Sequence, residues 1–369
     1  MNVLAEISRY QVDDHVIALP WAPDSSRCAA LSASGALMVS SLTKTPDFAP
    51  SLRLQTPPRR LDSERLRQAS REATSGTQST PTTVAVQPAG GLALSWGKPG
   101  ILTGGQEGMV SCWQANEDGL LVKGFEVDPG ERWAEHVLWS ADGTRFVTGA
   151  GKKLRIWSST GELLRDYSNQ SSTIAALCLR PDSQAVGIGI YGGVRLFRFA
   201  ESEPYEDLQW KGSIIELCWS PNGRFVAASS QERTINFWRL PFRPGEQLAM
   251  SGYPLKVREM AWDNDSRYLA TGGCELITIW DVSGKGPAGT HPIQLKFHAE
   301  RLTALQFQPA GARLASGSKD GKLAIWRSVK EKQPEFVAEL NAPISALRWS
   351  PCGRRLGVGT SEGEVVLFG

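Results

Sequence analysis

The side chains best suited to metal binding or nucleophilic catalysis are few and widely spaced in this chain. Its 369 residues include four histidines and six cysteines. The histidines are His15, His136, His291 and His298, and the cysteines are Cys28, Cys112, Cys178, Cys218, Cys274 and Cys352. No Cys-x-x-Cys pair occurs, and no histidine lies three or four positions from another, so zinc-site spacing is missing. We predict no metal, no cofactor and free thiols in a reducing, cytoplasmic compartment.

His298, Ser316 and Asp320 have the residue types of a hydrolytic triad. The alternative is a structural network of buried polar side chains that hydrogen-bond one another, with Trp326 as a fourth member. No paired carboxylates or activated nucleophile occur in a recognised catalytic motif elsewhere. We therefore predict that the protein is not an enzyme and has no small-molecule substrate.

A glycine-rich stretch, Ser283–Thr290 (SGKGPAGT), has the look of a phosphate loop. It lacks the GxxxxGK[ST] pattern and a following helix, so it is better explained as an exposed connection between strands.

Residues 43–81 differ in composition from the rest of the chain. They are rich in Pro, Ser and Thr at both ends and carry seven basic and four acidic side chains, including the candidate contacts Arg59, Arg60, Arg65, Arg67 and Arg71. A disordered loop and an element that contacts a partner or RNA are both compatible with this composition.

The overall composition indicates a folded protein with many short strands. Apolar residues make up 41% and charged residues 21%, and Lys+Arg (40) nearly balance Asp+Glu (38), which argues against a protein built mainly around nucleic acid. The chain contains 13 Trp and 37 Gly. It has no apolar run long enough to cross a bilayer and no basic, apolar N-terminal signal, so we expect no membrane association.

An internal repeat organises the chain. An aromatic or leucine anchor followed by a Pro, Asn, Asp or Gly turn recurs every 40 to 45 residues after one longer first interval. The eight anchors are Trp21, Trp96, Trp139, Leu179, Trp219, Trp262, Phe307 and Trp349. Within a repeat, alternating residues such as Ile215, Leu217 and Trp219 indicate a strand, and two further strands and a candidate fourth follow.

These eight copies resemble the WD-repeat (WD40) family over residues 1–42 and 82–369. The resemblance implies a single all-β propeller domain, 1–369, interrupted by the insertion at 43–81. Eight repeats favour eight four-stranded blades, with seven as the alternative. The last repeat stops after its third strand, so Val3–Tyr10 is expected to complete that blade. If Thr82–Gln87 is the fourth strand of the first blade, the insertion leaves between the third and fourth strands, and if Ser51–Thr56 is, it leaves on the opposite face.

The family also implies a buried His–Ser/Thr–Trp–Asp network in some blades. One complete set is present here, formed by His298, Ser316, Asp320 and Trp326. The resemblance thus favours the structural explanation of these residues over the catalytic one. The other repeats are expected to rely on apolar packing.

A rigid ring of blades with loops on two faces indicates a non-enzymatic scaffold for protein–protein interactions and complex assembly. The face made by the second-to-third-strand turns and by the loops before the first strands is the candidate partner site. Its exposed candidates are Glu107, Lys152, Lys153, Tyr191, Glu232, Arg233, Glu275 and Lys319. The alternative is an RNA- or nucleoprotein-binding module that uses the basic insertion. A further alternative is an accessory partner of a metallochaperone-type GTPase, because Ser283–Thr290 is similar to a segment of bacterial WD-repeat proteins, some of them encoded beside such GTPases.

Overall fold

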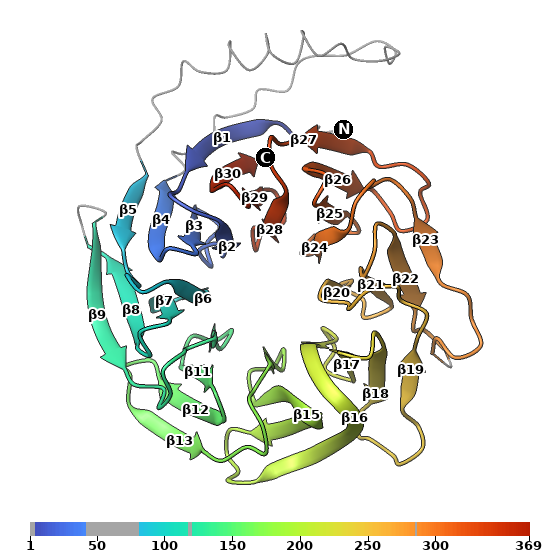
Figure 1. Cartoon of the computed structure of the whole chain (residues 1–369), viewed down its shortest axis with the longest axis horizontal. Coiled ribbons are helices and arrows are strands. Elements are labelled where there is room, and N and C mark those ends of the chain that lie inside the picture. The colour runs from blue at the N-terminus through green and yellow to red at the C-terminus, as the bar shows by residue number, and fades with distance from the viewer. Residues whose placement is uncertain (1–3, 42–80, 117–119, 285) are drawn as a thin grey trace, which may run out of the picture.

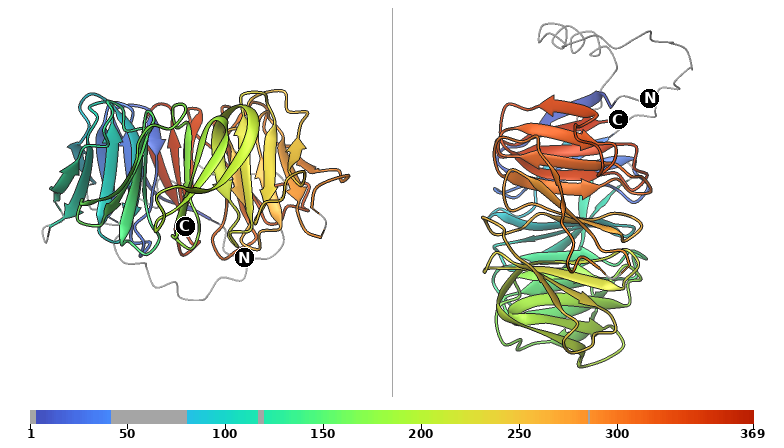
Figure 2. Two further views of the ribbon diagram at one scale, coloured as in Figure 1. Left: turned by 90° about the horizontal axis from the view of Figure 1, so that it is seen from below. Right: turned by 90° about the vertical axis from the view of Figure 1, so that its right-hand side faces the viewer.

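The computed structural model describes residues 4–41, 81–116, 120–284 and 286–369. Short antiparallel strands form sheets that are arranged in a closed ring around a central opening (Figure 1). Seen edge-on, the ring has loops on both of its faces (Figure 2). Within the described ranges, no helix has the length and hydropathy needed to cross a membrane.

Each repeat of the sequence supplies consecutive strands. The first three repeats form β2 (Val16–Ala18), β3 (Arg27–Ser32), β4 (Ala36–Ser41) and β5 (Thr82–Ala85); β6 (Gly91–Gly97), β7 (Gly100–Gly105), β8 (Val110–Ala115) and β9 (Leu121–Val127); and β10 (His136–Trp139), β11 (Arg145–Ala150), β12 (Lys153–Ser158) and β13 (Leu163–Tyr167). The fourth and fifth repeats form β14 (Ala176–Leu179), β15 (Ala185–Arg198), β16 (Pro204–Trp219), β17 (Phe225–Ser230), β18 (Ile235–Arg239) and β19 (Leu248–Met250).

The last three repeats follow the same order. They form β20 (Met260–Trp262), β21 (Tyr268–Thr271), β22 (Ile277–Asp281) and β23 (Ile293–Leu295); β24 (Leu302–Phe307), β25 (Leu314–Ser318), β26 (Lys322–Trp326) and β27 (Phe336–Glu339); and β28 (Ile344–Trp349), β29 (Leu356–Thr360) and β30 (Glu364–Phe368), to which β1 (Glu6–Gln11) is added.

The number of separate sheets corrects the sequence prediction. The described strands form seven sheets, six with four strands and one with six. The predicted eight separate blades are therefore wrong as a count of sheets, and the alternative of seven is right. The reason is β16, which runs without a break through two repeats: Leu208 pairs with Val194 of β15, while Leu217 pairs with Ala228 of β17. The fourth and fifth repeats thus share the six-stranded sheet.

The closure predicted from the sequence is confirmed. Strand β1 pairs antiparallel with β30, with Tyr10 opposite Val365 and Gln11 opposite Glu364. The amides of Ala5 and Gly369 each donate to the other's carbonyl at 3.0 Å. The first and last described segments therefore lie side by side and complete one four-stranded sheet (Figure 1).

The hydrophobic core lies between neighbouring sheets, where the anchor aromatics pack. The Trp139 indole contacts Phe146, with ring centroids 5.2 Å apart, and Phe146 in turn stacks on Trp157 at 5.9 Å. Gly97 of the preceding sheet makes room for this indole, because a Cβ at that position would lie 2.5 Å from the ring. Close aromatic packing of this kind fills the seam between the second and third repeats and stiffens the ring there.

Two faces of the ring are distinguished below. The upper face carries the turns between second and third strands and the segments that lead into first strands. The lower face carries the turns between first and second strands and the loops between third and fourth strands. Val39 of β4 pairs with Thr82 of β5, so the insertion leaves between a third and a fourth strand, on the lower face. The alternative in which Ser51–Thr56 supplies the fourth strand is wrong, and the insertion's candidate contacts Arg59, Arg60, Arg65, Arg67 and Arg71 lie outside the described residues.

Candidate interaction face

The structure brings the eight predicted interaction residues to one face. Six of them lie in turns between the second and third strands of their repeats, and Lys153 is the first residue of the third strand β12. Tyr191 lies within β15, where the second strand of its repeat passes directly into the third, so all eight are on the upper face. They come from six repeats: Glu107, Lys152 and Lys153, Tyr191, Glu232 and Arg233, Glu275, and Lys319. Positive and negative side chains alternate around the ring, so the face has no single sign of charge.

These residues differ in how much of the side chain is available. Tyr191 lies within β15 and is 65% exposed. Lys153 is half-buried, because its Nζ donates to the carbonyl of Gly130 at 2.6 Å. Arg233 is exposed, but its Nη1 donates to the carbonyl of Pro254 at 3.1 Å. Lys153 and Arg233 therefore also link neighbouring segments of the face, whereas the Tyr191 side chain is exposed to solvent and available to a partner.

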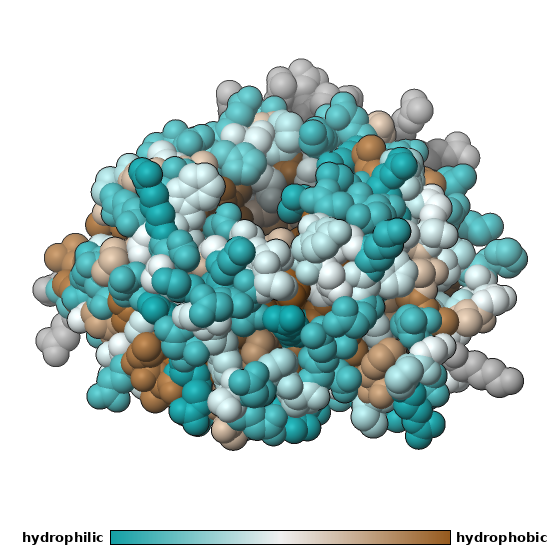
Figure 3. Space-filling model, turned by 60° about the horizontal axis from the view of Figure 1, so that its bottom comes forward, coloured by the Kyte–Doolittle hydropathy of each residue, from teal (hydrophilic) through white to brown (hydrophobic). Residues whose placement is uncertain are grey.

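Two exposed apolar side chains on this face were missed by the sequence analysis. Trp133 is 54% exposed and Leu255 is 45% exposed, and each lies in a segment that leads into a first strand. A tryptophan shortly before a first strand, outside both the anchor and the third-strand positions of the repeat, is the signal that could have identified Trp133. Large apolar side chains in water are typical of contact surfaces when they gather on one face. The side of the molecule seen in Figure 3 is largely hydrophilic, with apolar side chains in separate small groups.

Backbone hydrogen bonds, one between neighbouring repeats and one within the sixth repeat, hold the upper face in place. The amide of Ala134, next to Trp133, donates to the carbonyl of Gly105 at 3.0 Å. The amide of Leu255 donates to the carbonyl of Gly273 at 3.1 Å. Because each segment is tied to a turn between second and third strands, the exposed side chains are presented from a fixed backbone.

Two carboxyl groups that are largely shielded from water lie near the inner end of this face, Glu259 buried and Glu216 half-buried. Glu216 and Glu259 occupy the same position in consecutive repeats, three residues before the anchors Trp219 and Trp262. Burial raises the pKa of the Glu216 carboxyl to about 7, and Glu259 adds to the rise while Arg258 opposes it. Burial also raises the pKa of Glu259, whose Oε1 lies 3.4 Å from Nη2 of Arg301. The repeat alignment could have identified this pair, because a glutamate is unusual in an inner strand whose neighbouring positions are mostly apolar.

The predicted polar network is assembled in the seventh repeat. His298 Nε2 lies 2.8 Å from Ser316 Oγ, and Trp326 Nε1 donates to the same Oγ at 3.2 Å. Asp320 accepts from the amides of Ala299 and Lys322, both at 2.9 Å, and its Oδ1 is 3.5 Å from His298 Nδ1. Burial works to raise the pKa of Asp320, but these amides and His298 outweigh it, so the pKa is lowered. Ser316 is fully buried, which fits a structural contact between strands and turns.

The expectation that the other repeats rely on apolar packing is wrong for three of them. In the second repeat, Thr103 Oγ1 accepts from Trp113 Nε1 at 3.0 Å and from Gln87 Nε2 at 3.2 Å. In the third repeat, Trp157 Nε1 donates to Thr148 Oγ1 at 3.0 Å. The sequence analysis looked for a histidine and therefore missed Gln87.

The sixth repeat uses a tyrosine instead of the histidine. Tyr253 Oη lies 2.9 Å from Thr271 Oγ1 and accepts from Trp280 Nε1 at 2.7 Å. Its ring comes from the segment before β20, the same place from which His298 reaches β25 in the seventh repeat.

The cysteines are all free thiols. Cys178 and Cys218 directly precede the anchors of consecutive repeats and pack into the clusters that contain Trp219 and Trp262. Burial raises the pKa of Cys178 to about 11, and no group of three or more His, Cys, Asp or Glu residues converges within the ranges the structure covers. The glycine-rich stretch around Ser283–Thr290 joins β22 to β23 on the lower face.

Comparison with known proteins identifies the repeats. The family model described as "WD domain, G-beta repeat" (WD40) matches residues 207–239, 246–281 and 289–327, which correspond to the fifth, sixth and seventh repeats. The chain is 20% identical over 245 residues to the WD repeat-containing protein WDS homolog of Arabidopsis thaliana, over 63% of this chain and 46% of that protein. It is 25% identical over 199 residues to Protein HIR1 of Mycosarcoma maydis, over 44% of this chain and 19% of that protein.

A third relative is Cell division cycle 20.1, cofactor of APC complex, of Arabidopsis thaliana, 30% identical over 121 residues, with 32% of this chain and 25% of that protein covered. The chain therefore spans less than half the length of each of these curated relatives. Among solved structures, the computationally designed Ika8 protein superposes with a TM-score of 0.76 at 17% identity, over 98% of this chain and 99% of that one. That likeness concerns the fold. The repeats matched by the family model are thus WD40 repeats, and the closed ring of sheets that continues them makes this chain a WD40-type β-propeller.

Proposed function

We propose that this protein is a non-enzymatic scaffold that binds protein partners on its upper face. The observation that carries the proposal is the convergence of turns from six repeats on one rigid face, with Trp133, Tyr191 and Leu255 exposed among charged side chains. Aromatic side chains presented from a fixed backbone lose little conformational entropy when they are buried by a partner. The named relatives support a role in protein assemblies, since one of them is described as a cofactor of a complex.

The proposal is tested by comparing what variants capture. Affinity purification with mass spectrometry is run on the wild type, on a Trp133→Ser/Tyr191→Ser variant, and on Val337→Ser. Val337 is 44% exposed but lies on β27, away from the upper face, so it is a matched control. We expect the double variant to lose partners that the control retains. Equal capture by all three proteins, with unchanged thermal unfolding, would contradict the use of this face.

The basic insertion supports RNA or nucleoprotein as a second candidate partner. Residues 43–81 hold seven basic and four acidic side chains. RNA binding through them should weaken steeply as salt rises and should be lost when residues 43–81 are deleted. Binding that is independent of salt, or that survives the deletion, would count against this candidate.

A further inference from the structure

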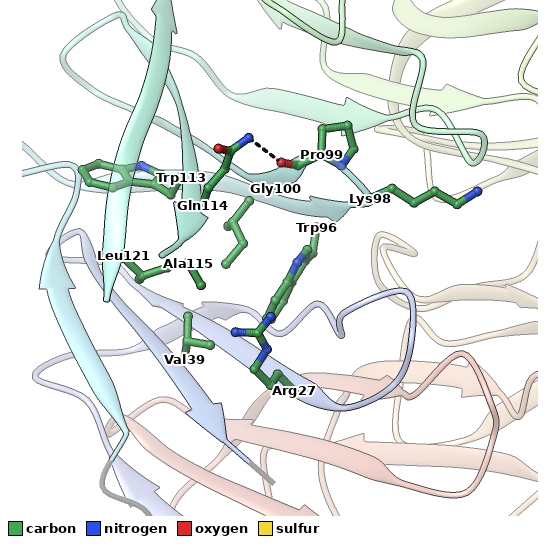
Figure 4. Close-up of a pocket in the computed structure, with 11 residues that line it drawn as sticks. Arg27, Val39, Trp96, Lys98, Pro99, Gly100, Trp113, Gln114, Ala115 and Leu121 are labelled. Carbon is green, nitrogen blue, oxygen red and sulfur yellow. Dashed lines mark hydrogen bonds between the residues drawn. The ribbon is translucent and has the colours of Figure 1, made fainter. Parts of the chain in front are cut away.

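A cleft of about 280 Å³ opens between the first and second sheets on the lower face. Arg27 and Val39 form the side that belongs to the first sheet, and Trp96, Ala115 and Leu121 are on the side of the second (Figure 4). The cleft thus combines an apolar wall, an indole and a guanidinium. It lies on the opposite face from the interaction residues discussed above.

The cation in this cleft lacks a carboxylate within the described structure. The Arg27 guanidinium carbon lies 5.7 Å from the centre of the Trp96 ring, and Figure 4 shows the guanidinium between that indole and Val39. Among the described residues, no ion pair to Arg27 occurs. The nearby Asp24 is engaged by Ser26, whose Oγ donates to it at 2.6 Å. The N–H donors of Arg27 are therefore available to an acceptor that enters the cleft.

Equivalent arginines in this chain show what the position binds. Arg313 and Arg355 follow the anchors of the seventh and eighth repeats by the same spacing at which Arg27 follows Trp21. Arg313 forms an ion pair with Glu335 from the loop between third and fourth strands. Arg355 Nη1 donates to the carbonyl of Ser25 at 2.9 Å. Two of the equivalent guanidinium groups thus bind an oxygen acceptor at the seam, a carboxylate in the seventh repeat and a carbonyl in the eighth, whereas Arg145 of the third repeat lies over the ring of Phe199.

We propose that the cleft binds a short acidic peptide segment of a partner protein. A carboxylate of the peptide accepts from the Arg27 guanidinium, whose planar fork suits two parallel hydrogen bonds. The apolar residue next to that acid packs against Val39, Ala115 and Leu121. Lys98, at the rim, adds positive charge that favours the approach of an acidic segment. The positive charge of the cleft thus favours an acidic residue in the peptide, and the apolar wall favours an apolar residue next to it.

The test uses two unlabelled peptides, acetyl-Gly-Glu-Leu-Gly-amide and its neutral counterpart with Gln in place of Glu, titrated calorimetrically into the full chain at low salt. We expect the acidic peptide to bind at least about tenfold more tightly, because a charge-assisted hydrogen bond is stronger than a neutral one. Arg27→Gln should abolish the preference. Arg145→Gln should preserve it, because Arg145 occupies the equivalent position in the third repeat, over Phe199, and does not line this cleft. Equal affinity for the two peptides, or a preference that survives Arg27→Gln, would overturn the proposal.

A second variant guards against loss of folding. Ala115 is exposed, so Ala115→Leu fills the cleft from its rim without disturbing the core, and it should weaken the acidic peptide while the melting temperature stays unchanged. Undiminished peptide binding by this variant would also overturn the proposal. The Trp133→Ser/Tyr191→Ser variant should bind the peptide normally, so failure of the upper-face proposal and failure of this one give different results.

Discussion

The indole Nε1 of Trp280 donates to the hydroxyl of Tyr253 at 2.7 Å, and that hydroxyl lies 2.9 Å from Thr271 Oγ1. In the seventh repeat, the equivalent link runs from Trp326 through Ser316 to His298. The two repeats therefore fasten the same three parts of the chain with different side chains. What the fold needs is a polar group that reaches from the segment before the first strand to the second strand.

Removing the Tyr253 hydroxyl should weaken the fold. Tyr253→Phe leaves Trp280 Nε1 without its acceptor in a largely buried place, so the free energy of unfolding should fall by about 1–3 kcal/mol, measured by chemical denaturation. Tyr205→Phe is the matched control, because the Tyr205 hydroxyl is buried with no hydrogen-bond partner within the described residues. That substitution should be neutral or stabilising. If the two variants lose equal stability, the hydrogen bonds of Tyr253 contribute nothing specific.

Asp320 should contribute to stability through the two hydrogen bonds that its carboxylate accepts from backbone amides. Asp320→Ala removes both hydrogen bonds and the contact with His298, so we expect a lower melting temperature and a loss of about 1–3 kcal/mol. The control is Glu362→Ala in the corresponding turn of the eighth repeat, where the side chain is exposed. An unchanged melting curve for Asp320→Ala would remove the network from the account of stability.

The sequence predicted the all-β ring, the eight repeats, the closure by β1 and the complete network, because these depend on spacing and on a few residue types that recur. It did not predict that β16 is continuous, since a strand that runs from Pro204 to Trp219 joins two repeats across a segment that contains no strong turn signal. It missed Gln87 and Tyr253 because their roles depend on whether the side chain extends far enough to contact the second strand, and several residue types can do so. It could not predict the cleft at Arg27 and Trp96, because that site combines residues from two different repeats.

Acidification should destabilise the protein through two histidines, His298, which is buried, and His136, which is half-buried. Burial lowers the pKa of His298, although Asp320 opposes this, and burial lowers the pKa of His136, although its contact with the Ile174 carbonyl opposes this. In the unfolded chain both rings take up a proton near pH 6.5, whereas the folded state resists it, so stability is full above that pH and falls as the pH drops below it. The melting temperature measured from pH 7.5 to 5 should therefore decline less steeply in His298→Gln than in the wild type. His291→Gln is the control because His291 is exposed, and its slope should match the wild type. A His298→Gln slope equal to that of the wild type would contradict the claim that protonation of His298 destabilises the folded state.

Glu216 should have the opposite dependence on pH. Its pKa is raised from 4.5 to about 7 by burial, so below pH 4.5 the folded and unfolded states are both protonated and the residue imposes no penalty. As the pH rises from 4.5 to 7, the unfolded chain ionises first and the folded state becomes relatively less stable. Glu216→Gln removes that penalty, so it should stabilise the protein by roughly 1–3 kcal/mol at pH 8 and much less at pH 4.5, as measured by urea unfolding at both values. Glu275→Gln, at an exposed turn of the same face, should change stability little at either pH. A gain that is the same at both pH values would mean that the carboxyl is not held in a protonated state by its surroundings, and that packing alone accounts for the effect.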